Sequence, residues 1–378
     1  MKKVLRNPYF TFVVLSMAAV MVSMGCSSPR TLRSTDFDPV TLRRVDSLCM
    51  RQMEMGHFPG LAVGIANRKT SWSKGYGFAD IEHQIPVDPA DHLFRIGSIS
   101  KTVTAAALAR EIQKGKINLD EPIDTYYKDL PADKQQLTLR QVAGHLAGIR
   151  HYQGDEFFST VHYSNIFEPL EVFIHDSLLF APGTRFSYST YGWTLVSAVM
   201  EKAVGKSFTD IVRDDVSEPL HLTQLKPDQV DSVAYHRVTF YYSSNDTLLV
   251  APFVDNSNKW AGGGFLCTTD DLIRFGAALT GPGYVKKKVF TTCTTTQYTS
   301  DGKPTGNGIG FFNGTEEDGD KWYGHSGGSV GGTSMLLIYP DRDLVIVTLV
   351  NLSSARMDDL ARKIAELIPS SRSKKRSQ

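Results

Sequence analysis

The sequence Ser98-Ile99-Ser100-Lys101 begins a run of alanine, valine, leucine and threonine residues that continues with helical spacing to Ile112. A lysine three residues after a serine lies one turn further along a helix and on the same face, where its amine can accept the hydroxyl proton. The amine can do this near neutral pH only if burial or a neighbouring cation lowers its pKa. The stretch therefore predicts an apolar helix with Ser98 as nucleophile and Lys101 as base. On this motif alone, a helix-capping serine beside a solvated lysine is the alternative.

The same four-residue spacing occurs at three other places, and its context differs in each. Ser71 and Lys74 lie in an expected strand, where residues three apart point to opposite faces. Residues 300–303 lie in a loop rich in glycine and proline, and residues 371–374 lie in a polar tail. Only Ser98 begins a long apolar helix, so only this serine is a candidate nucleophile.

Strand-like segments lie toward both ends of the chain, on either side of a mainly helical middle that extends to about Leu279. The expected strands are Leu61 to Ala66, Ser71 to Gly77, Ile309 to Phe312, Thr333 to Tyr339 and Leu344 to Asn351. Amphipathic helices are expected at Val40 to Met55 and at Ala355 to Ile368. This order predicts an α/β fold of the α+β type. One antiparallel sheet is built from the N- and C-terminal strands, helices flank it, and a mostly helical lobe is inserted, with a cleft between sheet and lobe.

The N-terminus has the pattern of an export signal. Lys2, Lys3 and Arg6 precede an uncharged apolar stretch that is too short to span a membrane as a helix. The sequence Ser23-Met24-Gly25-Cys26 then resembles the end of a bacterial lipoprotein signal. We expect a signal peptide at residues 1–25, lipidation of Cys26 and a linker at 26–39. Anchoring in a membrane of the bacterial envelope follows, and an ordinary cleaved signal peptide with a periplasmic product is the alternative.

Composition limits the classes of partner. Lysine and arginine total 41 against 40 aspartate and glutamate residues, so the chain has no basic surplus for a nucleic-acid partner. Removal of residues 1–25 takes away three basic residues and changes the formal net charge from +1 to −2. The remaining Cys49, Cys267 and Cys293 are expected to be buried small hydrophobic residues. No zinc, nucleotide or flavin motif occurs, so no metal and no cofactor is expected. The basic tail at residues 369–378 is expected to be disordered.

Two further motifs follow in order, and with the first they give a specific resemblance. They are Tyr188-Ser189-Thr190 and His325-Ser326-Gly327-Gly328. The order resembles the superfamily of class C β-lactamases, penicillin-binding proteins, D-aminopeptidases and esterases, over residues 40–368. The stretches from Gly144 to Tyr152 and from Trp260 to Leu266 are similar to the mitochondrial serine β-lactamase-like proteins and their bacterial relatives. The resemblance implies a β-lactamase/transpeptidase-like fold.

The resemblance also implies roles for single residues. Ser98 would attack the carbonyl, Lys101 would take its proton, and Tyr188 would act as partner base and return the proton to the leaving group. The backbone N–H groups of Ser98 and Gly328 would form the oxyanion hole. The positions expected to bind substrate are Thr190, His325, Ser326, Gly327 and Gly328. The residues expected to order or pack the site without chemistry are His145, His151, Tyr152 and Gly262 to Gly264.

The implied activity is that of a serine hydrolase that cleaves amide or ester bonds through an acyl-enzyme. Its substrate would be a small peptide, an ester or a compound derived from the cell wall. A catalytically silent relative that binds peptidoglycan or peptide is one alternative, and a true β-lactamase is another. Thr190 stands where class C β-lactamases carry asparagine, and His325 stands where they carry lysine. Both departures weaken β-lactam recognition, so esters and peptides are the expected substrates.

Overall fold

The computed structural model describes residues 33–34, 37–230, 236–245, 247–281, 283–357 and 359–369. The expected signal peptide, Cys26 and the tail from residue 370 lie outside the described residues. The helices are α1 (Pro39–Gly56), α2 (Ile99–Gln113), α3 (Ala132–Gln135), α4 (Leu139–Ala143), α5 (Thr190–Val204), α6 (Phe208–Val212), α7 (Glu218–Leu220), α8 (Trp260–Gly263), α9 (Thr269–Thr280), α10 (Lys287–Thr294) and α11 (Leu360–Leu367). The strands are β1 (Arg33–Ser34), β2 (Gly60–Ala66), β3 (Thr70–Asp80), β4 (Ile85–Pro86), β5 (Phe94–Arg95), β6 (Lys226–Pro227), β7 (Tyr241–Ser244), β8 (Thr247–Val250), β9 (Phe265–Cys267), β10 (Phe312–Thr315), β11 (Lys321–Ser329), β12 (Gly332–Tyr339) and β13 (Leu344–Val350).

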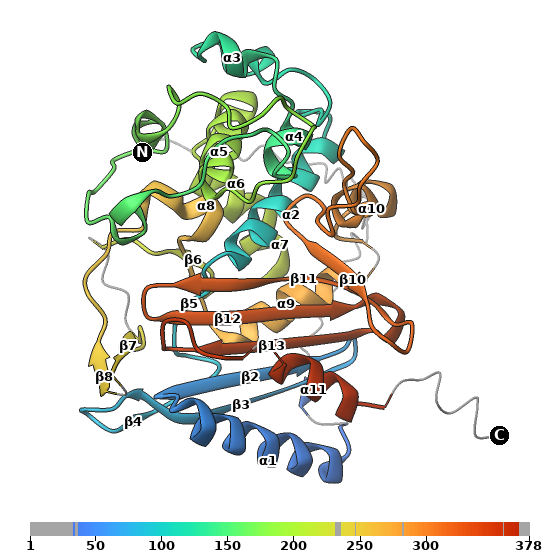
Figure 1. Cartoon of the computed structure of the whole chain (residues 1–378). Helices are drawn as coiled ribbons and strands as arrows, with labels where there is room; N and C mark the ends of the chain where they lie inside the picture. Colours follow the sequence, from blue (N-terminus) through green and yellow to red (C-terminus); the bar gives the residue numbers. More distant parts are fainter. Residues whose placement is uncertain are drawn as a thin grey trace, which may run out of the picture. The chain divides into compact units, whose positions relative to one another are not determined.

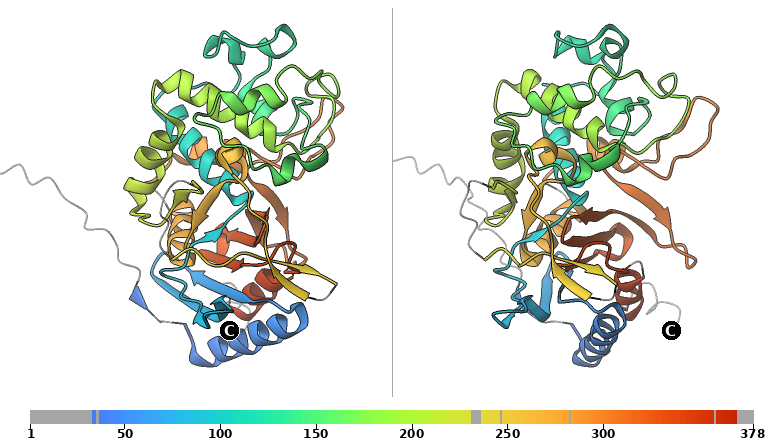
Figure 2. Two further views of the ribbon diagram at one scale, coloured as in Figure 1. Left: turned by 90° about the vertical axis from the view of Figure 1, so that its left-hand side faces the viewer. Right: turned by 60° about the vertical axis from the view of Figure 1, so that its left-hand side comes forward.

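Strands from both ends of the chain form one eight-stranded sheet (Figure 1). Its order is β1-β3-β2-β13-β12-β11-β10, with β4 paired to β3. N-terminal β2 pairs antiparallel with C-terminal β13, and Leu61 faces Val350 in that register. The two views of Figure 2 show these blue and red strands side by side. The predicted fold class, an antiparallel sheet built from the two ends with a helical lobe inserted between them, is confirmed.

Both faces of the central strands are buried, which explains why β2 and β13 are continuously apolar. Along β2, Leu61, Val63 and Ile65 face a core cluster that also includes residues of α1 and α11. The alternate residues face the second cluster, where α9 packs against β2 and β13. Gly64 leaves room for that helix, because a Cβ there would lie 2.5 Å from Cγ2 of Ile273. Sheet and helices therefore form three layers around two apolar cores.

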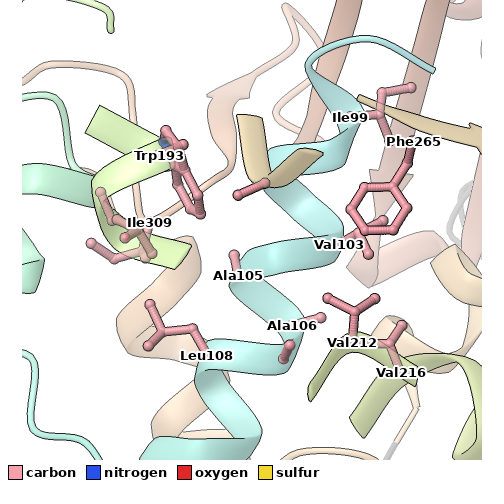
Figure 3. Packing of buried hydrophobic residues seen from close by; sticks show 14 of the residues in the cluster. Ile99, Val103, Ala105, Ala106, Leu108, Trp193, Val212, Val216, Phe265 and Ile309 are labelled. Carbon is pink, nitrogen blue, oxygen red and sulfur yellow. The ribbon is translucent and has the colours of Figure 1, made fainter. Parts of the chain in front are cut away.

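Helix α2 runs through the core, and nearly every residue from Ile99 to Ala109 is buried. Figure 3 shows its small side chains packed on one side against Trp193 of α5 and Ile309, and on the other against Val212 and Phe265. A helix that is apolar on all faces is stable only when other elements surround it. The alanine and threonine content of α2 permits this close packing, so α2 holds its N-terminal end at a fixed place between sheet and lobe.

The structure differs from the expectation at several points. The strand expected at Ile309 to Phe312 begins only at Phe312, because Gly310 has φ +73° and the preceding chain turns over α2. The C-terminal helix begins at Leu360, not Ala355. The segment from His325 to Gly328, which precedes the expected strand at Thr333, lies within β11. The middle of the chain also contributes the three-stranded sheet β5-β9-β6 and the hairpin β7-β8, and the hairpin lies beside the main sheet, where Tyr241 joins the core cluster of α1 and α11. Within the linker expected at residues 26–39, Arg33–Ser34 pairs with β3 as a short parallel strand.

Candidate active site

Ser98 lies at the N-cap of α2, three residues after the end of β5. Gly97 before it has φ +50°, a left-handed conformation that favours glycine. A Cβ at Gly97 would lie 2.7 Å from the backbone nitrogen of Gly328 and 2.8 Å from its carbonyl oxygen. The missing side chain therefore lets β11 approach the start of α2, so the expected oxyanion donor at Gly328 is held next to the residue that precedes Ser98.

Lys101 lies one turn further along α2, with its side chain fully buried. Its Nζ is 3.0 Å from Ser98 Oγ and 3.1 Å from Thr190 Oγ1, and it donates to the carbonyl oxygen of Gly262. Burial, and then the charge of Lys259, hold the pKa of Lys101 well below its ordinary value. A neutral amine satisfies all three neighbours by donating two N–H groups and accepting the serine hydroxyl proton.

Tyr188 reaches Ser98 from the loop that precedes α5. Its hydroxyl donates to Ser98 Oγ at 2.8 Å, and Lys101 Nζ lies 4.8 Å from the centre of its ring. Burial raises the pKa of the phenol, which the hydrogen bond with Ser98 offsets only in part. Tyr188 is therefore a neutral phenol at pH 7. The structure brings Ser98, Lys101 and Tyr188 into one hydrogen-bonded group.

Two histidines hold the backbone that carries this group. His145 Nδ1 accepts from the N–H of Ser189 at 3.1 Å, and His151 Nδ1 accepts from the N–H of Thr190 at 3.2 Å. Their rings pack against Tyr188, with centroid distances of 4.4 and 5.6 Å. Both histidines thus hold the loop that carries Tyr188 in place, which is the kind of role that the sequence predicts for them. Because each Nδ1 accepts a hydrogen bond, both imidazoles are neutral with the proton on Nε2.

His325 lies in β11 with its ring against Phe312, at a centroid distance of 4.3 Å. Its Nδ1 donates to the carbonyl oxygen of Ser326 at 2.6 Å. Burial, followed by the charge of Lys101, lowers the pKa of His325 to about 3. Its ring centroid lies 6.2 Å from that of Tyr188, and its buried Nε2 has no hydrogen-bond partner among the described residues.

The other expected binding residues take different places. Thr190 is buried, and its Oγ1 contacts Lys101 instead of lying open to a ligand. Gly327 packs inward, because a Cβ there would lie 2.1 Å from the carbonyl oxygen of Ile96. Ser326 and Gly328 are exposed, and together with Gly327 they line a cavity of about 300 Å³. Gly262 packs tightly, as expected, since a Cβ would lie 2.6 Å from Cγ2 of Thr190.

Sequence reasoning missed two contributors to the site. One is the carbonyl oxygen of Gly262, which a side-chain motif cannot indicate. The other is Lys259, which is buried directly before α8. Its position next to the motif from Trp260 to Leu266 was the available signal. A lysine that follows the polar run Asn256-Ser257-Asn258 has the sequence appearance of a solvated residue, so the signal is weak.

Among the described residues, no group of three or more His, Cys, Asp or Glu side chains is arranged to bind a metal ion. No helix in this part of the chain is long and apolar enough to cross a membrane. Cys49, Cys267 and Cys293 are buried and unpaired, as small hydrophobic residues would be.

Solved structures with this arrangement define the class of fold. An octameric penicillin-binding protein homologue from Pyrococcus abyssi superposes with a TM-score of 0.77 at 22% identity, covering 86% of this chain and 77% of that one. A D-amino acid amidase from Ochrobactrum anthropi SV3 superposes with a TM-score of 0.75 at 19% identity, covering 87% and 96%. The fold is the β-lactamase/transpeptidase-like fold.

Sequence comparison then gives the family. A family model described as Beta-lactamase matches residues 45–368, and the chain belongs to this family. The human mitochondrial serine beta-lactamase-like protein LACTB is 28% identical over 417 residues, covering 81% of this chain and 76% of that protein. Protein flp of Staphylococcus aureus (strain N315) is 23% identical, covering 82% of this chain and 63% of flp. The resemblance expected from the motifs is confirmed.

The histidines around Tyr188 should stay neutral as the pH is lowered from about 8 to about 5. Burial lowers the pKa of His325 to about 3 and that of His151 to about 4, and it holds the pKa of His145 well below the ordinary value. The exposed His83 is an internal reference, because its hydrogen bond with Asp80 raises its pKa. Nitrogen-15 NMR of the imidazoles across this pH range measures the protonation of the three buried histidines and of His83. Protonation of His325 above about pH 6 would contradict the site geometry.

Proposed function

We propose that this protein is a serine hydrolase that cleaves ester or amide bonds through an acyl-enzyme on Ser98. The observation that carries the proposal is the position of the Ser98 hydroxyl. It lies between a buried amine at 3.0 Å and a phenol at 2.8 Å. An isolated serine hydroxyl is a weak nucleophile, and an adjacent base within hydrogen-bonding distance activates it.

In the first proton transfer, Ser98 is the donor and Lys101 is the acceptor. As Ser98 Oγ bonds to the substrate carbonyl carbon, its proton passes to the neutral amine. The ammonium that forms is stabilised by the Gly262 carbonyl oxygen, by Thr190 Oγ1 and by the face of the Tyr188 ring. Because its pKa is raised, Tyr188 acts as a relay in place of the partner base expected from the resemblance. It gives its proton to the leaving group and regains one from Lys101, and water then cleaves the ester on Ser98.

The oxyanion that develops on the substrate needs donors in fixed positions. We assign this role to the backbone N–H groups of Ser98 and Gly328. In sites of this kind one donor contributes about 3 kcal/mol to the barrier reduction. The close approach of Gly97 and Gly328 supports the assignment, since it fixes the distance between the two chain segments that carry the donors.

The walls of the site favour neutral esters and peptides over β-lactams. His325 is uncharged at pH 7 because burial lowers its pKa, so it provides no permanent cation for a drug carboxylate. Thr190 is turned toward Lys101, so its hydroxyl is engaged away from an acylamido side chain. Similar solved structures include a D-stereospecific amidohydrolase from Streptomyces and the D-amino acid amidase, and both names denote amide cleavage. These structures support the amidase or esterase form of the proposal.

One observation favours a second candidate function. The cavity along Ser326, Gly327 and Gly328 is also lined by Arg356, which is an exposed residue. A permanent cation at that end of the site could receive a substrate carboxylate. A substrate with a free C-terminal carboxylate, or a β-lactam, would use it. A beta-lactamase/D-alanine carboxypeptidase from Pseudomonas syringae is among the similar solved structures, which supports this second candidate.

Serine-directed labelling tests the nucleophile. Ser98→Ala should abolish labelling by a fluorophosphonate probe, because the activated hydroxyl is lost. Ser71→Ala should label like the parent, because Ser71 lies in β3 and has only the same four-residue spacing. Lys101→Ala and Tyr188→Phe should each reduce turnover at least about a hundredfold, the usual scale for lost acid–base assistance. Labelling of Ser98→Ala at the parental rate would show that the nucleophile is another residue, and a parent that never labels would favour the catalytically silent alternative.

Substrate preference distinguishes the candidates. With purified mature protein, hydrolysis of small esters or peptides should clearly exceed nitrocefin turnover, and penicillins should act at best as slow acylating inhibitors. The reason is that acylation needs only Ser98, Lys101 and the oxyanion hole, whereas drug recognition needs groups that Thr190 and His325 do not supply. Nitrocefin hydrolysis with kcat/KM of roughly 10⁶ M⁻¹s⁻¹ or more would instead support a true β-lactamase.

We also propose that the protein acts in the bacterial envelope as a lipoprotein anchored at Cys26. The support is the charged and then apolar N-terminal sequence that ends at this cysteine. Cys26→Ser should abolish labelling with a fatty-acid analogue and move the protein from membrane to soluble exported fractions. Membrane association that is unchanged in the variant would contradict lipidation.

A further inference from the structure

A second buried lysine lies close to the site. Lys259 ends the 3-10 turn Ser257–Lys259 and directly precedes α8, the helix whose Gly262 carbonyl oxygen holds Lys101. Only 4% of its surface is exposed. Lysine is almost never fully buried unless an acidic partner neutralises it, because removal of an ammonium group from water is costly.

The surroundings of Lys259 provide no such ion pair. Its Nζ donates to the carbonyl oxygen of Phe157 at 3.1 Å and lies over two aromatic rings, 4.9 Å from the centre of Phe157 and 5.4 Å from that of Tyr152. Within the described parts of the chain, no carboxylate oxygen forms an ion pair with it. The two carboxylates whose charge reaches Lys259, Asp228 and Asp255, are bonded elsewhere.

Both carboxylates have partners of their own. Asp228 accepts from Arg95 at 2.7 Å and from Asn256 at 2.7 Å. Asp255 binds His162 Nδ1 at 2.8 Å and accepts from the N–H of Ser257. The positive charge of Lys259 is therefore stabilised mainly by a carbonyl dipole and by ring faces, which leaves its field largely uncompensated in a medium of low dielectric constant.

A short chain of contacts joins the two lysines. The ring of Tyr152 lies under the ammonium of Lys259, and the hydroxyl of Tyr152 is hydrogen-bonded to the side chain of Thr190. Thr190 Oγ1 in turn lies 3.1 Å from Lys101 Nζ. Lys259 and Lys101 thus occupy opposite ends of the same Tyr152–Thr190 pair.

We propose that Lys259 is a positioning residue whose positive charge keeps Lys101 unprotonated near neutral pH, so that Lys101 can act as the base toward Ser98. The inference rests on the proposed function and extends it. Two like charges in a medium of low dielectric constant disfavour one another, and the more deeply buried lysine loses its proton more readily because burial disfavours the charged form. His325, which stands at the position of the family's second lysine, is neutral and cannot supply this charge.

The charge states of the neighbouring groups agree with a charged Lys259 and a neutral Lys101. Of the groups that face Lys101, the three histidines His145, His151 and His325 have lowered pKa values and Tyr188 has a raised one, so all four are neutral at pH 7. Lys259 is the cation whose charge lowers the pKa of Lys101. Burial and Arg95 lower the pKa of Lys259 itself to about 8, while Asp228 and Asp255 raise it, so Lys259 still carries its proton at pH 7.

The test is the pH dependence of Ser98 acylation by a fluorophosphonate probe. The rate follows the unprotonated fraction of Lys101, so it falls on the acid side of the pKa of that amine. Lys259→Met removes the like charge and keeps the apolar stem, so the pKa of Lys101 should rise. The acid limb of the profile should move up by about one pH unit, with about tenfold slower labelling on that limb and recovery of the rate at higher pH.

Two variants separate charge from packing. Lys259→Arg keeps the charge and should retain the parental pH profile. Lys134→Met removes another fully buried lysine, which pairs with Asp133 away from the site, and should leave the profile unchanged. Circular dichroism melts report whether each variant is folded. An acid limb that is unmoved in folded Lys259→Met, or moved equally by Lys259→Arg, would overturn the inference. A parental protein that never labels at Ser98 would instead contradict the proposed function on which it rests.

Discussion

The candidate active site is organised around the burial of the Lys101 amine. A lysine in water is protonated at pH 7 and cannot accept the proton of a serine. In this protein the amine is enclosed by α2, α5 and α8, and its partners are a carbonyl oxygen, a threonine hydroxyl and Ser98. Such enclosure requires α2 to run through the core, and the small residues of α2 make that course sterically feasible.

Glycines at the contacts around α2 allow the neighbouring elements to approach closely enough to enclose this amine. A Cβ at Gly310 would lie 2.7 Å from the Lys101 carbonyl oxygen, and one at Gly262 would meet Thr190. A Cβ at Gly97 would meet the backbone of Gly328. Each absent side chain lets a different element approach the turn from Ser98 to Lys101. Strand β11, the start of α5 and helix α8 are thereby held close to the turn that carries the Ser98 hydroxyl.

The sequence predicted the parts of this arrangement that are local. The one-turn spacing on an apolar helix predicted that Ser98 and Lys101 lie together, and alternating or continuous apolar runs predicted β2, β3, β12 and β13. It did not predict that His325 lies inside a strand, because Gly324, Gly327 and Gly328 give that segment the composition of a loop. The same holds for Lys259, since its burial depends on Tyr152 and Phe157, about a hundred residues earlier in the chain. Long-range packing of this kind leaves no periodic pattern in the chain.

The proposed mechanism depends above all on the protonation state of Lys101 at pH 7. Carbon-13 NMR of protein labelled at lysine Cε, with the Lys101 signal assigned by its loss in Lys101→Met, follows the charge of each amine through a pH titration. We expect the Lys101 signal to have the shift of a neutral amine at pH 7 while the surface lysines remain charged. A Lys101 signal that titrates with the surface lysines, near the ordinary pKa of about 10.4, would contradict the proposed role of Lys101 as the base.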